Sequence, residues 1–426
     1  MKTQLVEDGG SAIVIAPDTG NARKISLVVG AGIGMAGGFA SLYFSTLSIF
    51  LKPIATMFGW GRGQLSAVAL LAMIGSALAA PVVGKLIDRY GAQRVTGMSV
   101  VLFAAGLACL SQLPGSIFAL SLLSFSLGAL ATATTPPGYL SVFPQHFDKR
   151  LGAALGCAMI GIGVGAAAAP LLAQALIAAH GWRESYLWLA GLALVFGLLA
   201  NLLCFAAGPR ANSSPVARSV GAAESYEGDD LRTAIRTRRF WLIAVALWLV
   251  SASALGAMIH LFSLLTDRGI APAVAAGAVA TVGVAAGLGR FATGILMDSF
   301  SARIVTACVF ILGGGGLATL ALSSAGTSIV VYTVAAAFFG LAIGAEGDII
   351  PFLARRYFGR KAFGTIFGCF FSAYMLGAFA GPIAYGIGFD RLGGYTFPLV
   401  AASIACLAAT CLVLAIGPYR YGPGHK

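Results

Sequence analysis

Three ionisable residues lie inside long apolar runs of the sequence: Arg290, Glu346 and Asp348. A charged group within membrane hydrocarbon costs about 2.5 kcal/mol or more, so it normally faces a cavity or a partner. The guanidinium of Arg290 is permanently charged and can donate two parallel hydrogen bonds to a carboxylate. We therefore predict that Arg290 binds an anionic group of a small molecule. The alternatives are that this long side chain reaches the membrane surface or that it pairs with Glu346.

Glu346 and Asp348 are two positions apart, a spacing that separates them by about 200° around a helix. The two carboxyl groups are therefore expected on different faces and in different roles. A buried carboxyl group that gains and loses a proton would couple transport to a proton gradient. In the alternative, one acid neutralises Arg290 and the other neutralises Arg355 or Arg356.

Polar side chains within other apolar runs are candidates to line a binding cavity. His260 could titrate or bind substrate, or it could simply pack between helices. Most other polar residues in such runs bond a neighbouring helix, which is the alternative for each of them. The remaining substrate-binding candidates are Tyr43, Ser45, Thr46, Thr134, Tyr139 and Tyr374.

The composition excludes a soluble protein. Of the 426 residues, 58% are hydrophobic and 10% are charged, whereas soluble domains carry about 25% charged residues. The net charge of +12 comes from short basic clusters between apolar runs. This pattern is typical of loops that orient a membrane protein, and it does not form a nucleic-acid-binding stripe.

Twelve apolar runs are long enough to cross a membrane as helices, because a crossing needs about 20 residues. They are continuous and rich in Leu and Ala rather than alternating, which favours helices over barrel strands. The runs cover approximately 25–51, 65–87, 95–112, 116–140, 151–178, 183–206, 240–265, 272–297, 304–323, 327–352, 362–388 and 395–416.

The fold class is therefore predicted as an all-α membrane protein with twelve transmembrane helices in two six-helix halves. The halves cover 25–207 and 240–416, a polar linker covers 208–239, and tails cover 1–24 and 417–426. Most of the 27 Lys and Arg residues fall on one side of this arrangement. Because basic residues stay on the cytoplasmic side, we expect both termini in the cytoplasm, with the protein in a bacterial-type inner membrane.

Signals for other chemistry are missing from the sequence. It has no phosphate-binding glycine-rich loop, no Ser/His/Asp set and no Cys or His pattern at metal-ligand spacing. We predict that the protein is not an enzyme and uses no nucleotide, metal or other cofactor. The expected partners are the lipid bilayer, a small organic anion and protons.

An internal repeat relates the two halves at a spacing near 210 residues. GKLIDRYGAQRV, from Gly84, aligns with GILMDSFSARIV, from Gly294, and this alignment places Asp88 opposite Asp298. GCAMIGIGVGAAAAP, from Gly156, aligns with GCFFSAYMLGAFAGP, from Gly368. The two halves are therefore expected to share one fold in the same orientation.

Two such halves joined by a cytoplasmic linker resemble the major facilitator superfamily, whose loop motif after the second helix is matched by Gly84, Asp88, Arg89, Gly91 and Arg94. The resemblance implies transport through a central cavity by alternating access. It also implies that Asp88, Arg89 and Arg94 form a latch between helix ends in the outward-facing state. Asp298 and Arg303 would form a weaker latch in the second half, where Ser299 and Ser301 replace Arg89 and Gly91.

Finer detail resembles monocarboxylate-porter-type members, in the segments 47–66, 289–298 and 344–359. In those porters the residue matching Arg290 binds the substrate carboxylate. The sequence departs from the family at Ala286 and Ser45, where an Asp and a buried Lys would align, and at Phe370, where oxalate-type exchangers have a second cation. One buried Arg suits one carboxylate, so a monocarboxylate is the expected substrate, moved by proton symport. The alternatives are an efflux carrier for amphiphilic compounds and a membrane sensor that does not transport.

Overall fold

The protein consists of long helices that run back and forth between two ends of a bundle. The computed structural model describes residues 19–60, 62–147, 150–205, 227–324 and 326–421. Ten helical segments in these ranges are long and apolar enough to cross a membrane. Besides the first segment, they are α3 (Arg62–Tyr90), α4 (Ala92–Ser111), α8 (Leu151–Phe205), α11 (Arg238–Asp267), α12 (Pro272–Ser299), α13 (Ala302–Leu322), α14 (Ile329–Phe358), α15 (Phe363–Leu392) and α16 (Thr396–Leu414). Helix α8 turns at Gly181, whose φ is 77°, so it accounts for two of the predicted crossings.

The first and fourth crossings, predicted at about 25–51 and 116–140, each consist of several helical segments. The first consists of α1 (Thr19–Ala36), a π-helix (Phe39–Phe44) and α2 (Leu47–Phe58). The fourth begins with α5 (Ile117–Leu130) and continues through short helices, among them α6 (Pro136–Tyr139) and α7 (Phe143–His146). The two breaks meet, because the backbone N–H of Phe39 donates to the Thr134 hydroxyl at 3.1 Å.

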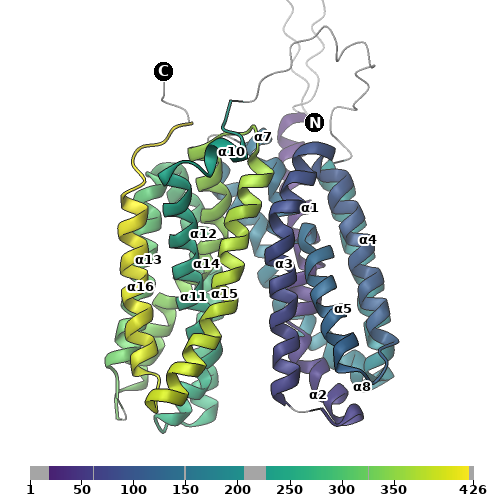
Figure 1. Ribbon diagram of the computed structural model, residues 1–426, viewed down its shortest axis with the longest axis vertical. Coiled ribbons are helices and arrows are strands. Elements are labelled where there is room, and N and C mark those ends of the chain that lie inside the picture. The colour runs from purple at the N-terminus through teal and green to yellow at the C-terminus, as the bar shows by residue number, and fades with distance from the viewer. Residues whose placement is uncertain (1–18, 61, 148–149, 206–226, 325, 422–426) are drawn as a thin grey trace, which may run out of the picture.

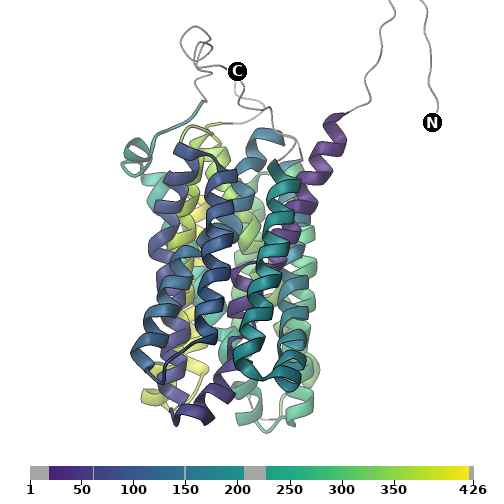
Figure 2. The same ribbon diagram turned by 90° about the vertical axis from the view of Figure 1, so that its right-hand side faces the viewer.

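The helices group into two halves that lie side by side, α1–α8 and α11–α16 (Figure 1). Helix α1 begins and α16 ends at the same end of the bundle, which we call the terminal face, and we call the opposite end the far face. In the view turned by 90°, the first turns of α1 lie at the edge of the bundle, at the terminal face (Figure 2).

The two halves share one apolar core and also have separate ones. The shared core joins residues such as Ala80 and Leu155 of the first half to Phe367 and Ile349 of the second. A second core, around Phe50, contains first-half residues alone, and a third, around Leu261, contains second-half residues alone. The shared core includes the last turns of α14 and the first turns of α15, at the terminal face. The halves are therefore packed together at that face.

The end of the predicted linker lies against the second half. Gly228 pairs with Gly359 in an antiparallel bridge, and α10 (Leu231–Ala234) follows. The carboxylate of Asp229 accepts hydrogen bonds from Arg420 at 2.8 Å and from the Tyr421 hydroxyl at 3.1 Å. These contacts join the segment that precedes the second half to the segment that follows α16. Residues 1–18, 206–226 and 422–426 of the predicted tails and linker lie outside the described residues.

Candidate functional site

Close packing of α12 against α14 places Arg290 beside Asp348. A Cβ on Gly344 would overlap the carbonyl oxygen of Ala286, so the two backbones touch there. Arg290 and Asp348 each follow this contact by four residues, which is about one helical turn. Both helices run toward the terminal face, so the two side chains are at the same level. Arg290 is accordingly the charged neighbour of Asp348.

The guanidinium of Arg290 lies where α12 meets α8 of the other half. Its Nη1 donates to the carbonyl oxygen of Met159 at 3.3 Å, and a Cβ on Gly163 would be 3.5 Å from the same nitrogen. Its Nε is buried and has no hydrogen-bond partner among the described residues. The side chain as a whole keeps partial exposure. Arg290 therefore lies between the two halves with donor capacity to spare.

The two acids of α14 lie on different faces, as their spacing predicts. Asp348 is 0% exposed and Glu346 is 1% exposed. Asp348 faces α8, since its Oδ2 would be 3.6 Å from a Cβ on Gly156. Glu346 has Tyr374 and Cys406 as its neighbours within the second half. Neither carboxyl oxygen of Asp348 has a hydrogen-bond partner in the part of the chain that the structure describes.

Among the polar candidates, Tyr374 has both Arg290 and Glu346 as charged neighbours. The first-half candidates make other contacts. The Tyr43 hydroxyl bonds Ser124 at 2.8 Å, Ser45 bonds the carbonyl of Ser41, and Thr46 bonds the carbonyl of Leu42 at 2.7 Å. The Tyr43 bond joins two crossings of the first half, whereas Ser45 and Thr46 bond the backbone of their own crossing.

Thr134 and Tyr139 lie in the broken fourth crossing. Thr134 donates to the carbonyl of Ala131 at 2.7 Å while it accepts from Phe39. Tyr139 is 0% exposed and packs against Gly34 of α1. Its hydroxyl has no partner among the described residues. Both side chains therefore support the broken helices from inside the first half.

His260 belongs to a ring cluster within the second half. Its Nε2 lies 3.1 Å from the carbonyl oxygen of Pro382, and its Nδ1 lies 3.4 Å from the Tyr395 hydroxyl. Its ring stacks on Tyr385, with centroids 6.0 Å apart. Both ring nitrogens therefore have partners, as expected of a histidine that packs between helices.

A carboxylate at the terminal end of α3 caps a helix of the other half. Asp88 accepts from the backbone N–H groups of Gly364 at 2.8 Å and Thr365 at 2.7 Å, and from the Thr365 hydroxyl at 2.6 Å. These donors form the first turn of α15, where the helix dipole favours an anion. Gly84 permits the approach, because a Cβ there would overlap the carbonyl oxygen of Gly364.

The repeat provides the same arrangement a second time. Asp298, near the end of α12, accepts from the N–H groups of Gly152 at 2.7 Å and Ala153 at 2.8 Å, in the first turn of α8. A Cβ on Gly152 would overlap the carbonyl oxygen of Gly294. Each half therefore caps a helix of the other. The second-half copy has one hydrogen bond fewer, because Ala153 occupies the place of Thr365.

Of the three charged residues expected in the first latch, Asp88 alone among them bonds the start of a helix in the other half in the part of the chain that the structure describes. Arg89 lies over the ring of Tyr90 at 5.2 Å, and Arg94 lines a groove on the outside of the first half. Gly91 begins α4 with a φ of 85°, a conformation that glycine adopts readily. Backbone donors at a helix start satisfy the carboxylate. Four donors to these aspartates were not predicted from the sequence, because their role depends on a place in the first turn of a helix. They are Gly364, Thr365, Gly152 and Ala153.

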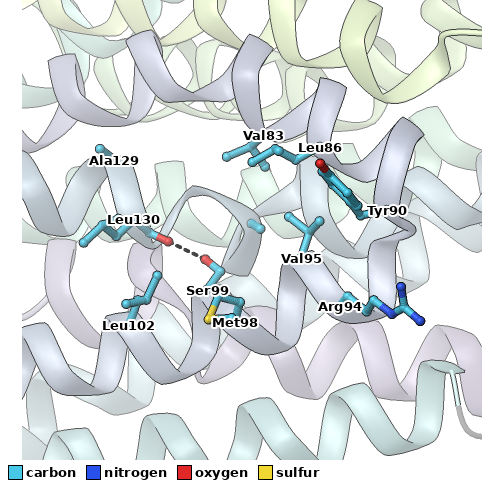
Figure 3. Close-up of a pocket in the computed structure, with 11 residues that line it drawn as sticks. Val83, Leu86, Tyr90, Arg94, Val95, Met98, Ser99, Leu102, Ala129 and Leu130 are labelled. Carbon is cyan, nitrogen blue, oxygen red and sulfur yellow. Dashed lines mark hydrogen bonds between the residues drawn. The ribbon is translucent and has the colours of Figure 1, made fainter.

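The groove beside Arg94 is drawn in Figure 3. It has a volume of about 390 Å³ between α3, α4 and α5, and its sticks are mostly apolar side chains, with Tyr90 and Arg94 near one end. Within it the Ser99 hydroxyl donates to the carbonyl of Leu130. It contains none of the substrate-binding candidates, and its composition suits lipid chains. Among the described residues, no group of three or more His, Cys, Asp or Glu side chains could hold a metal ion.

Two halves of six crossings, joined across one face and meeting at buried charges, define a multi-pass membrane carrier rather than an enzyme. The family model of the Major Facilitator Superfamily matches residues 33–382. The chain therefore belongs to this superfamily of transporters, as its sequence motifs predict.

Three curated relatives of the chain are named as transporters. It is 24% identical to monocarboxylate transporter 13 of Bos taurus over 90% of this chain and 85% of that protein. It is 26% identical to the gallate transporter of Pseudomonas putida over 84% of this chain and 86% of that one. A match to monocarboxylate transporter 2 of Mus musculus, 25% identical, spans 48% of this chain and 42% of that protein.

Solved structures share the fold. The superfamily transporter FucP in its outward conformation matches with a TM-score of 0.69 at 13% identity, over 93% of this chain and 99% of that one. The proton:xylose symporter XylE matches with a TM-score of 0.71 at 13% identity, over 94% and 97%. Identities this low establish the fold alone.

Proposed function

We propose that this transporter moves a small organic anion with one carboxylate, and that Arg290 binds that carboxylate. The observation that supports the proposal is the position of Arg290 between α12 and α8, with one weak backbone contact and a buried Nε that has no partner among the described residues. A permanent cation in such a place favours anionic partners, and the carboxylate of Asp348 lies nearby without accepting a hydrogen bond in the described ranges, which leaves the guanidinium donors available to a substrate. Two relatives are named for substrates that carry a carboxylate, namely monocarboxylates and gallate, and this supports the proposed substrate class.

Asp348 is the acid best placed to couple this binding to a proton. Without substrate, its carboxylate is the negative charge next to Arg290. When a substrate carboxylate binds Arg290, a second negative charge enters the same buried region, and a proton taken up by Asp348 removes the excess. The loaded site then carries no net charge, which favours the change between the two facing states. Glu346 faces Tyr374 and is less directly linked to the substrate.

The membrane and orientation complete the proposal. The terminal face is cytoplasmic, because most basic residues lie on that side, and the membrane is a bacterial-type inner membrane. Because the halves are packed together at that face, this conformation of the transporter is closed to the cytoplasm. The two aspartate caps then act as the latch of this state, with Gly84, Gly91 and the basic residues Arg89 and Arg94 shaping the same loop.

Proteoliposomes test the proposal. Uptake of labelled lactate- or pyruvate-like acids should accelerate when an inward proton gradient is applied. An efflux carrier for amphiphilic compounds would instead lower cellular sensitivity to toxic hydrophobic cations. A sensor would bind an acid without flux. A thermal-shift screen against short carboxylic acids provides the substrate class independently of direction, because a ligand stabilises the state that it binds.

A further inference from the structure

A polar cavity of about 260 Å³ lies at the terminal face between the two halves. Ser141 and Gln145, at the end of the fourth crossing, line it from the first half, and Arg360 and Lys361, between α14 and α15, line it from the second. A water molecule takes about 30 Å³, so the cavity has room for a small polyatomic ion. It is separate from Arg290, which is not among its lining residues.

The charges that line this cavity favour an anion. Arg360 and Lys361 contribute two positive charges, and Asp88 contributes one negative charge that is already bonded to the first turn of α15. The exposed Asp230 also acts on Lys361, but it does so through solvent. The Nε of Arg360 is buried and has no hydrogen-bond partner in the described ranges. Gly91 and Ala92, which begin α4, also line the cavity, and the first turn of α4 has no acidic residue and no side-chain cap.

We propose that this cavity binds a small oxyanion from the aqueous phase, such as phosphate or a short carboxylate, held by Arg360 and Lys361 with Gln145 and Ser141. Residues of both halves line the cavity, so the bound anion contacts both halves. It can therefore bind only while the terminal face is closed. Such a ligand stabilises the closed state and slows the transport cycle. The site is therefore an inhibitory one, separate from the transport site.

The test uses the full-length purified protein and inorganic phosphate at constant ionic strength, with chloride as the balancing anion. We expect the melting temperature to rise with phosphate and then saturate. The double variant Arg360→Gln, Lys361→Gln should lose this rise. Arg236→Gln, which removes an exposed charge near α10 outside the cavity, should keep it. Arg290→Gln should also keep it, so a failure of the transport-site assignment would leave this result unchanged.

Flux and lipid measurements complete the design. Phosphate placed on the terminal side of oriented proteoliposomes should slow uptake, and phosphate on the far side should not. An equal melting shift in the double variant and in the unmodified protein would overturn the proposal. Stabilisation by phosphatidylglycerol vesicles without any response to phosphate would do so too, because the ligand would then be a lipid headgroup.

Discussion

The Thr365 hydroxyl donates a 2.6 Å hydrogen bond to Asp88 that has no counterpart in the other half of the repeat. At the equivalent position, Ala153 offers Asp298 a backbone N–H and nothing more. The two caps that join the halves are therefore unequal by one side-chain donor.

Exchanging these two residues should exchange the strengths of the caps. Thr365→Ala should destabilise the closed terminal face by about 0.5–1.5 kcal/mol, the usual net contribution of one hydrogen bond, since Asp88 keeps access to solvent. Ala153→Thr should stabilise it by a similar amount. Spin-label distances between exposed position 89, in the first half, and exposed position 236, in the linker segment that packs against the second half, would measure the closed and open populations of this face. Identical distance distributions in both variants would show that the hydroxyl does not hold the face closed.

Replacing Arg290 should abolish transport of the organic anion. Arg290→Ala removes the cation, and Arg290→Lys retains the charge but loses the paired donors that fit a carboxylate. We expect at least a tenfold loss of uptake in both, about 1.4 kcal/mol or more of lost stabilisation. Loss of the melting shift with carboxylic acids should accompany it. Uptake at the original rate in both variants would contradict the assignment of Arg290.

Comparing Asp348→Asn with Glu346→Gln should show which of the two acids couples transport to the proton gradient. Asp348→Asn removes the charge next to Arg290, so we expect tighter anion binding, anion exchange that continues, and uptake that no longer responds to a proton gradient. Glu346→Gln changes an acid of the same helix that faces Tyr374, and it is expected to keep the gradient response. The comparison is made on counterflow and gradient-driven uptake in the same vesicles. The reverse pattern would transfer the coupling role to Glu346.

Two glycines of α8, two residues apart, should differ in their response to the same substitution. A Cβ on Gly161 would overlap the carbonyl oxygen of Gly32, so Gly161→Ala should destabilise the fold by about 1–3 kcal/mol through overpacking. A Cβ on Gly163 would be 3.5 Å from Arg290 Nη1, an ordinary contact, so Gly163→Ala should leave the melting temperature unchanged. The larger Gly163→Leu should raise the KM for the anion. If Gly163→Leu transports with an unaltered KM, the substrate does not reach this side of Arg290.

Hydropathy was sufficient to predict most crossings, because continuous apolar runs of about 20 residues have few other uses. It could not predict the breaks in the first and fourth crossings. The apolar run continues through the Gly37–Gly38 and Pro136–Pro137 pairs, and one of the contacts that satisfy the breaks is the hydrogen bond between Thr134 of one crossing and Phe39 of the other. Such a contact between distant segments leaves no periodic signal.

The sequence identifies candidate site residues but not which of them lie next to each other. A charge in an apolar run identifies Arg290 and Asp348, but their proximity depends on the contact between Gly344 and Ala286. The hydroxyls of Ser45 and Thr46 look the same in sequence as cavity groups, yet they bond carbonyls four residues earlier in their own helix. Asp88 was predicted to act at helix ends, but its backbone donors in the first turn of α15 could not be identified from residue types.

The apolar core that both halves share has a thermodynamic consequence for the cycle. To expose the opposite side of the site, the protein must separate Ala80 and Leu155 from Phe367 and Ile349, and water then wets these surfaces. Wetting apolar surface raises the heat capacity, so the two facing states should differ in heat capacity as well as in shape. Their balance should shift with temperature along a curve rather than a straight line, and warming and cooling from the midpoint should not have mirror-image effects.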